Sequence, residues 1–245
     1  MSHPYPGKLV VLEGTDGVGR TTHAASLQHW LEVEGYGVVL TEWKSSQLIS
    51  TVIDKAKSKN ALNTITFSLL YATDLADRLH NVILPALRSG LTVIADRYFY
   101  TAFARDVVRG ADPGWVRKLY GFAVEPDLVL YLKMPLEPLL RRIITTRGGL
   151  DFYESGRDIG ISTDLYQSFK LYQSKILQEY ERMSEEYNFK VACATDSIDS
   201  VQKQLRSMVS QLLQAEHSTP FGSGGSMPDP VAVLPKEDLH LKPSD

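Results

Sequence analysis

The sequence predicts an α/β protein in which a parallel β-sheet has helices on both faces. Short apolar runs typical of buried strands alternate with longer stretches of helical periodicity from Lys8 to about Ala215. The first apolar run leads into a glycine-rich loop that opens a helix. With 245 residues, 43% of them hydrophobic, the chain is long enough for one sizeable core and short for two full domains.

The first expected elements are a strand over 9–13, a helix over 21–35 and a strand over 37–42. Aliphatic side chains dominate both strands, as in a sheet that is buried on both faces. Gly35 ends the helix because glycine readily adopts the left-handed conformation that follows a helix.

Apolar residues then recur at helical spacing over 64–89, a stretch that Pro85 interrupts and Gly90 closes. The later elements follow from the same two periodicities. The expected strands are 91–96, 128–133 and 189–194, and the expected helices are 100–109, 114–124, 136–146, 164–187 and 198–214.

We expect one domain over 8–216, preceded by a short extension, 1–7, and followed by a disordered tail, 217–245. The tail is rich in serine, glycine and proline and has too few apolar residues to bury.

Charge and cysteine content exclude several classes of protein. The net charge of −3 at pH 7 gives no overall basic field, so binding to duplex nucleic acid is not expected. No apolar run is long enough to span a membrane, and no signal segment is recognisable. The one cysteine, Cys193, cannot form an internal disulfide and falls in an expected strand, which favours a reducing, cytoplasmic setting.

The glycine-rich loop predicts a site for nucleotide phosphates. Gly14 and Gly19 have the spacing of a P-loop, in which backbone N–H groups and a helix N-terminus surround an anion. Arg20 stands where lysine is usual; it keeps the charge and can grip phosphate with two N–H groups, but it is bulkier. Thr21 is placed to ligate Mg²⁺. A chance glycine turn is the alternative. The expected phosphate-binding residues are Gly14, Thr15, Asp16, Gly17, Val18, Gly19, Arg20, Thr21 and Thr22.

The strand over 91–96 leads into Asp96 and Arg97, at the carboxyl edge of the sheet where ligands usually bind. Asp96 is a candidate for holding Mg²⁺, and Arg97 for binding a substrate phosphate. Alternatively, Asp96 caps the next helix and Arg97 pairs with a surface carboxylate. The glycine loop favours the first interpretation.

Two helix faces are candidate substrate walls. Tyr71, Asp74 and Arg78 share one stripe of the long helix, so that an aromatic ring, an acid and a base lie together. Thr101 and Arg105 lie one turn apart on the next helix. These stripes fit a nucleobase pocket; a core tyrosine beside an exposed ion pair is the alternative.

The segment from about 146 to 160 is predicted to be a mobile lid, with arginines around a glycine hinge. A basic lid would neutralise charge on a transferred phosphoryl group and exclude water. A solvated basic helix end is the alternative.

Taken together, these motifs resemble the thymidylate kinase family of P-loop nucleoside monophosphate kinases over about 8–213. The glycine loop, the Asp96-Arg97-Tyr98 element and the strand entry at 125–132 occur in the family's order. The resemblance implies the P-loop NTPase fold with a five-stranded parallel sheet, ATP as phosphoryl donor and Mg²⁺ as cofactor. It also implies a homodimer formed through a helical face.

The resemblance implies roles for single residues as well. Asp16 contacts the sugar hydroxyl of the acceptor, Tyr71 stacks on its base and Tyr153 covers its deoxyribose. Arg97 binds the acceptor phosphate, and Thr195 belongs to the turn that frames the donor adenine. The expected substrate-binding residues are Asp16, Tyr71, Arg78, Arg97, Thr101, Arg105 and Tyr153.

The chain departs from the family pattern at several positions. Besides Arg20, residues 42–46 read Glu-Trp-Lys-Ser-Ser where the family has a Glu-Pro-Gly turn. Leu75 stands where the base-binding helix usually carries arginine. Because Gly17 stands where one subset has an additional arginine, we expect the catalytic arginine to come from the lid, with Arg147 as first choice.

The expected function is transfer of the γ-phosphoryl group of ATP to a nucleoside monophosphate, with dTMP as the favoured acceptor and dTDP as product. Arg20, Asp96 and Arg147 are the expected catalytic residues, and Thr21 and Asp96 the expected metal ligands. The alternatives are a kinase for a different nucleotide or small phosphorylated acceptor, and a nucleotide-binding regulatory module that has lost turnover.

Overall fold

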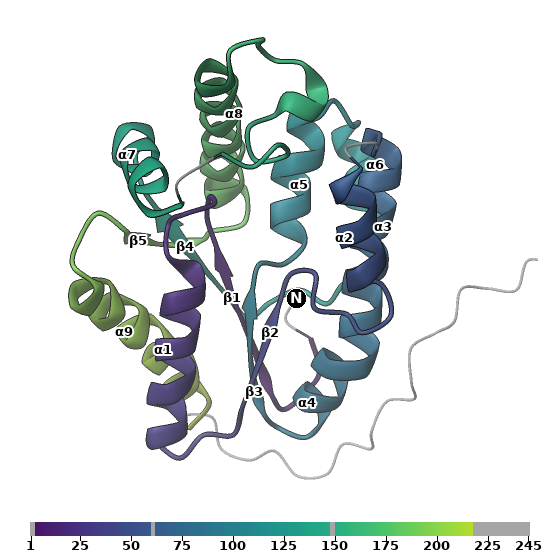
Figure 1. Cartoon of the computed structure of the whole chain (residues 1–245). Coiled ribbons are helices and arrows are strands. Elements are labelled where there is room, and N and C mark those ends of the chain that lie inside the picture. Colours follow the sequence, from purple (N-terminus) through teal and green to yellow (C-terminus); the bar gives the residue numbers. More distant parts are fainter. Residues whose placement is uncertain (1–2, 60–61, 148–149, 218–245) are drawn as a thin grey trace, which may run out of the picture.

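Five parallel strands form one sheet in the computed structural model, which describes residues 3–59, 62–147 and 150–217 (Figure 1). The strand order is β2-β3-β1-β4-β5, and every neighbouring pair is parallel. All five strand predictions are confirmed to within a residue at each end. The strands are β1 Lys8–Glu13, β2 Val38–Glu42, β3 Thr92–Asp96, β4 Leu128–Lys133 and β5 Lys190–Cys193.

Helices cover both faces of this sheet (Figure 1). They are α1 Arg20–Val33, α2 Ser50–Ser58, α3 Thr64–Arg78, α4 Leu84–Arg88, α5 Phe99–Val108, α6 Pro113–Leu119, α7 Leu136–Arg147, α8 Leu165–Glu186 and α9 Ile198–His217. Val10 and Leu12 of β1 pack with α1 and α9, whereas Leu9 and Val11 pack with α3, α5 and α8. All four side chains are fully buried, as expected of a central strand in a parallel sheet.

The helices differ from the sequence prediction in three places. The predicted helix 64–89 divides into α3, a π-helical segment over Leu79–Ile83 and α4, because Pro85 has no N–H to donate. The helix predicted over 114–124 ends early, at Leu119, and a turn over 120–122 follows it. We did not predict α2. Ile53 is its one buried residue, so the segment shows little of the apolar periodicity that marks a helix in sequence.

The domain boundaries stay predictions. His217 is the last residue of α9, and the rest of the predicted tail lies outside the described residues. None of the helices in the described ranges is both long enough and apolar enough to cross a bilayer.

Candidate active site

The glycine loop connects the carboxyl end of β1 to the N-terminus of α1, as the sequence predicts. Gly14 and Gly17 both have positive φ angles, 147° and 78°. A Cβ atom on Gly14 would lie 2.8 Å from the Leu132 carbonyl oxygen, and one on Gly17 would lie 2.5 Å from Ile143. Glycine is therefore required at both positions for the loop to keep this path, which leaves a backbone cradle at the positive end of a 14-residue helix.

Arg20, Thr21 and Asp96 lie together beside the loop, although 75 residues or more separate the aspartate from the other two. The Arg20 Nε donates to Asp96 Oδ1 at 2.9 Å, and its Nη1 donates to the carbonyl oxygens of Gly14 and Thr15. The Thr21 hydroxyl donates to Asp96 Oδ2 at 2.7 Å. Burial alone would lower the pKa of Arg20, but the carboxylates of Asp96 and Asp16 raise it, so the guanidinium stays charged.

A hydroxyl and a carboxylate are hard oxygen ligands, the kind that Mg²⁺ takes one or two of from a protein while substrate phosphates and water supply the rest. Thr21 and Asp96 therefore fit the metal role expected from the sequence, beside a loop whose path requires glycine at positions 14 and 17.

Asp16 joins the loop to a second cationic cluster. Its Oδ1 is ion-paired with Arg97 and its Oδ2 with Arg105, the latter at 2.5 Å. Burial and the neighbouring Arg20 lower the pKa of Arg97. Two guanidinium groups thus converge on one carboxylate, which leaves excess positive charge for an anion at this point. The sequence placed all three residues in a substrate site, and the structure brings them together.

Glu13, the last residue of β1, accepts hydrogen bonds from residues next to this cluster. Its buried carboxylate accepts hydrogen bonds from the Tyr98 N–H (2.9 Å), from the Thr101 N–H (3.2 Å) and hydroxyl (2.7 Å), and from the Tyr180 hydroxyl (2.8 Å). Burial raises the pKa of Glu13. Thr101, expected at the substrate, is completely buried and bonded to Glu13, so in this structure its hydroxyl holds the first turn of α5.

Tyr71 belongs to an aromatic cluster rather than to an open wall. Its ring stacks on Trp43 at a centroid distance of 5.2 Å, and Phe67 lies 4.7 Å away. Tyr153 packs against Phe67 at 5.7 Å. Only 3% of Tyr71 is exposed, and burial raises its pKa to about 12. One face of the ring expected to stack on a base is therefore covered by Trp43.

Asp74 and Arg78 form a buried ion pair of 2.9 Å, not the exposed pair that was the alternative. Arg78 also donates to the Thr41 hydroxyl at 3.2 Å. Arg78 therefore contacts β2 and Trp43 in the turn that follows it, rather than the cluster around Asp16. Leu75 is fully buried in the core.

Arg109 ties the segment after α7 to α5, a role that the sequence analysis missed. Its Nε donates to Asp158 at 2.6 Å and its Nη2 to the Tyr153 carbonyl at 2.8 Å. Its guanidinium also lies over the rings of Phe67 (4.6 Å) and Tyr172 (5.1 Å). The one sequence signal was its position four residues after Arg105, on the same helix face.

Two further predicted residues are exposed, and a third is described only in its backbone. Thr22 is exposed in the first turn of α1, and Thr195 is exposed after β5 with its hydroxyl 3.0 Å from the Cys193 sulfur. Arg147 ends α7, but its side chain lies outside the described residues. Arg142, one turn earlier, donates to the Val18 carbonyl at 3.3 Å and so reaches the glycine loop.

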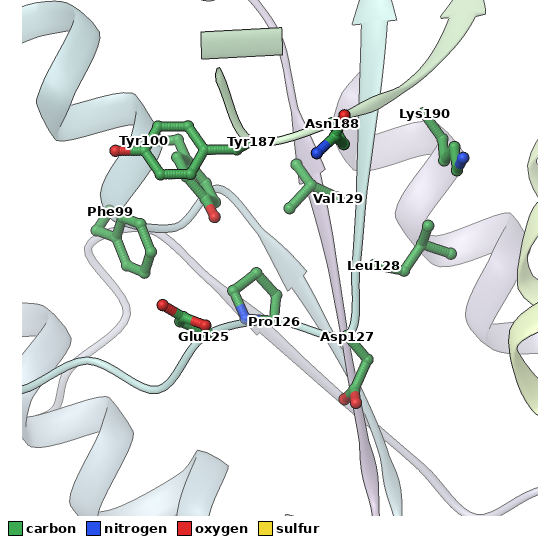
Figure 2. Close-up of a pocket in the computed structure, with 10 residues that line it drawn as sticks. All are labelled: Phe99, Tyr100, Glu125, Pro126, Asp127, Leu128, Val129, Tyr187, Asn188 and Lys190. Carbon is green, nitrogen blue, oxygen red and sulfur yellow. The ribbon is translucent and has the colours of Figure 1, made fainter. Parts of the chain in front are cut away.

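A separate cavity of about 340 Å³ lies beside the first residues of β4 and β5 (Figure 2). Phe99, Tyr100 and Tyr187 lie on one side of it and Lys190 on the other. The glycine loop follows the opposite, carboxyl end of the parallel strands, so this cavity is not part of the candidate site.

Comparison with known proteins points to one family. The family model described as "Thymidylate kinase" matches residues 12–205. A protein from Saccharolobus solfataricus named "Probable thymidylate kinase 2" is 41% identical over 208 residues, which cover 84% of this chain and 97% of that protein. "Probable thymidylate kinase" of Thermococcus gammatolerans is 33% identical, with coverage of 84% and 97%. "Thymidylate kinase" of Desulfotalea psychrophila is 28% identical, with coverage of 85% and 97%.

Proposed function

The chain belongs to the thymidylate kinase family of nucleoside monophosphate kinases, and we propose that it transfers the γ-phosphoryl group of ATP to the 5′-phosphate of dTMP, giving dTDP and ADP. The observation that carries this proposal is the bridge that Arg20 makes between Asp96 (2.9 Å) and Asp16 (3.9 Å). Arg20 also donates to the Gly14 and Thr15 carbonyl oxygens of the loop, and Asp16 is ion-paired with Arg97 and Arg105. A donor and an acceptor phosphate would therefore adjoin, as direct in-line transfer requires.

Each part of the site has a distinct task in this proposal. The loop N–H groups and Arg20 bind the donor phosphates, while Arg97 and Arg105 bind the acceptor and neutralise its charge. Mg²⁺, held by Thr21 and Asp96, would supply charge neutralisation on the donor. Asp16, ion-paired with Arg97 and Arg105, would accept a hydrogen bond from the acceptor sugar.

Two arginines are candidates for the catalytic arginine, whose charge would stabilise the phosphoryl group during transfer. Arg147 is our first choice from the sequence, and Arg142 gains support from its contact with the Val18 carbonyl. Replacing each by alanine in turn tests this choice, with the exposed neighbour Arg141 as the matched control. The catalytic arginine is the one whose loss lowers kcat by about 100-fold or more while Arg141→Ala changes kcat little.

Acceptor identity is tested by coupled ADP release with ATP and Mg²⁺ against dTMP, dUMP, dCMP, UMP, CMP and AMP. Selective turnover of dTMP is the expected result. Preference for another acceptor would instead support the second candidate, a kinase for a different monophosphate, which the Trp43–Ser46 sequence and Leu75 favour. ATP binding without release for any acceptor would support a regulatory module.

We also propose that the protein is a cytoplasmic homodimer. Cys193 is an exposed free thiol, which suits a reducing compartment. Ile65 and Leu69 lie one turn apart on α3, 60% and 47% exposed, and offer an apolar face for a second copy. Light scattering coupled to gel filtration should report a dimer in the native chain and a monomer in Ile65→Asp.

A further inference from the structure

The turn after β2 has a backbone that its sequence does not favour. Lys44 adopts a φ of 65°, the left-handed conformation that glycine takes easily and lysine takes rarely. The turn starts at the carboxyl edge of the sheet, where the Trp43 N–H donates to the Asp96 carbonyl at 3.1 Å. Some other interaction must therefore hold the backbone in this shape.

Asp74 supplies that interaction from α3. Its Oδ2 accepts the Lys44 N–H and its Oδ1 accepts the Ser46 N–H, both at 3.0 Å. The Arg78 Nε, 2.9 Å from Oδ2, neutralises the carboxylate. Asp74 is 0% and Arg78 1% exposed. The hydrogen bonds from the two backbone amides to Asp74 are therefore charge-assisted and shielded from water.

Side chains of the turn add to the same arrangement. The Ser46 hydroxyl donates to Asp77 at 2.5 Å and accepts the Leu48 N–H at 3.1 Å. The Ser45 hydroxyl donates to the Glu42 carbonyl at 2.6 Å. The Ser46–Asp77 bond also reaches α3, but it holds a side chain, whereas Asp74 holds two backbone amides of the turn.

The turn carries one wall of the proposed acceptor site. The Trp43 ring stacks on Tyr71, and the Arg78 guanidinium lies 5.9 Å from the same indole. The Asp74–Arg78 pair therefore fixes both the backbone of the turn and the ring that it presents. A shift of the Lys44 backbone would move Trp43, and with it the surface beside Asp96 and Arg97.

We propose that Asp74 is a positioning residue that shapes the acceptor site through the Trp43–Ser46 turn. A buried carboxylate does here what a proline would do by fixing φ and a glycine by allowing a positive φ. This inference rests on the proposed function in one respect, because the wall it shapes is that of the proposed acceptor site.

Asp74→Asn tests the proposal, because an amide of the same shape cannot accept both backbone N–H groups and leaves Arg78 without its counter-ion. We expect the KM for dTMP to rise about tenfold, while the KM for ATP and kcat stay within about twofold. Adding Lys44→Gly should restore most of the KM, because glycine keeps the left-handed turn unaided. Asp77→Asn is the matched control: it removes a charge one turn away on α3 but keeps a side-chain oxygen that can accept the Ser46 hydroxyl and leaves both Asp74 hydrogen bonds in place. This variant should keep the KM for dTMP within about twofold of the native value.

Backbone hydrogen exchange without nucleotide gives a readout that does not depend on activity. The Lys44 and Ser46 amides should be protected in the native chain and exchange about tenfold or more faster in Asp74→Asn. If Asp74→Asn does not fold, Asp74→Asn with Arg78→Gln leaves no unpaired buried charge and should show the same changes.

Unprotected amides in the native chain would overturn the proposal, as would a folded variant that loses protection with no change in the KM for dTMP, or a KM that Lys44→Gly does not restore. If the native chain releases no ADP with any acceptor, the proposed function fails, while the exchange of these two amides still decides whether Asp74 holds the turn.

Discussion

The donor and acceptor sides of the candidate site are built in different ways. The donor side is mostly one continuous segment, the glycine loop and the start of α1, with Asp96 as its main distant member. The acceptor side draws on the turn after β2, on α3, on α5 and on the segment after α7. A site made of one segment can be recognised from sequence, whereas a site assembled from four depends on contacts that sequence spacing does not reveal.

The largest expected effect is on the donor side, at Arg20. Arg20→Met removes the charge that bridges Asp96 and Asp16, and we expect kcat to fall about 1,000-fold, as for loss of a preorganised charge at a transferred group. Arg20→Lys should keep most of the turnover, because it keeps the charge. Steady-state kinetics with dTMP measure both. Equal activity in all three proteins would mean that the donor side does not depend on this segment.

The second largest expected effect is on the acceptor side, at Arg109. Arg109→Leu leaves Asp158 without its 2.6 Å partner in a buried place, and we expect the free energy of unfolding to fall by about 3 kcal/mol. Because Arg109 holds the Tyr153 carbonyl, the KM for dTMP should rise as well.

Arg117→Leu is the matched control for this variant. Arg117 also pairs with a carboxylate, Glu186, and lies over a ring, Phe103, but its ion pair is solvent-accessible. Denaturant unfolding should show a loss of about 0.5 kcal/mol. A similar loss in both variants would contradict the assignment of Arg109 as the anchor of the acceptor side.

The sequence predicted the strands, the glycine loop and the pair Asp96–Arg97, because each is encoded by neighbouring residues whose periodicity or spacing is visible. It did not predict the roles of Glu13 or Asp74. A buried carboxylate has no local signature, since what makes it tolerable is a set of donors from other elements. Tyr71 and Arg78 were recognised as one helix stripe, but their partners Trp43 and Thr41 come from β2 and the turn that follows it.

On the acceptor side, the buried carboxyl of Asp106 on α5 lowers the stability of the folded chain at neutral pH. This carboxyl is 1% exposed, and its Oδ2 has no hydrogen-bond partner among the described residues. Burial raises its pKa from 3.8 to about 6, against the opposing effects of Ser68 and Arg109. The folded chain therefore binds more protons than the unfolded chain between these values, so the free energy of unfolding falls as the pH rises through this interval.

Asp106→Asn should remove this loss and stabilise the protein at pH 7 by about 2 kcal/mol, with little change at pH 4. Thermal unfolding across pH 4 to 8 measures the difference between the two proteins. Parallel curves for the native chain and Asp106→Asn would mean that Asp106 does not titrate in this interval.

The smallest effect tests whether the two sides are separate at all. Arg105→Met should raise the KM for dTMP about tenfold and change kcat little, because Arg97 still pairs with Asp16. By sequence Asp16 belongs to the donor loop, but its contacts are with acceptor arginines and, at 3.9 Å, with Arg20. If Asp16 couples the sides, the effects of Arg20→Met and Arg105→Met on kcat/KM will not multiply in the double variant. Simple multiplication would instead mean that donor and acceptor sites are independent, and that the contact between Arg20 and Asp16 carries no energy between them.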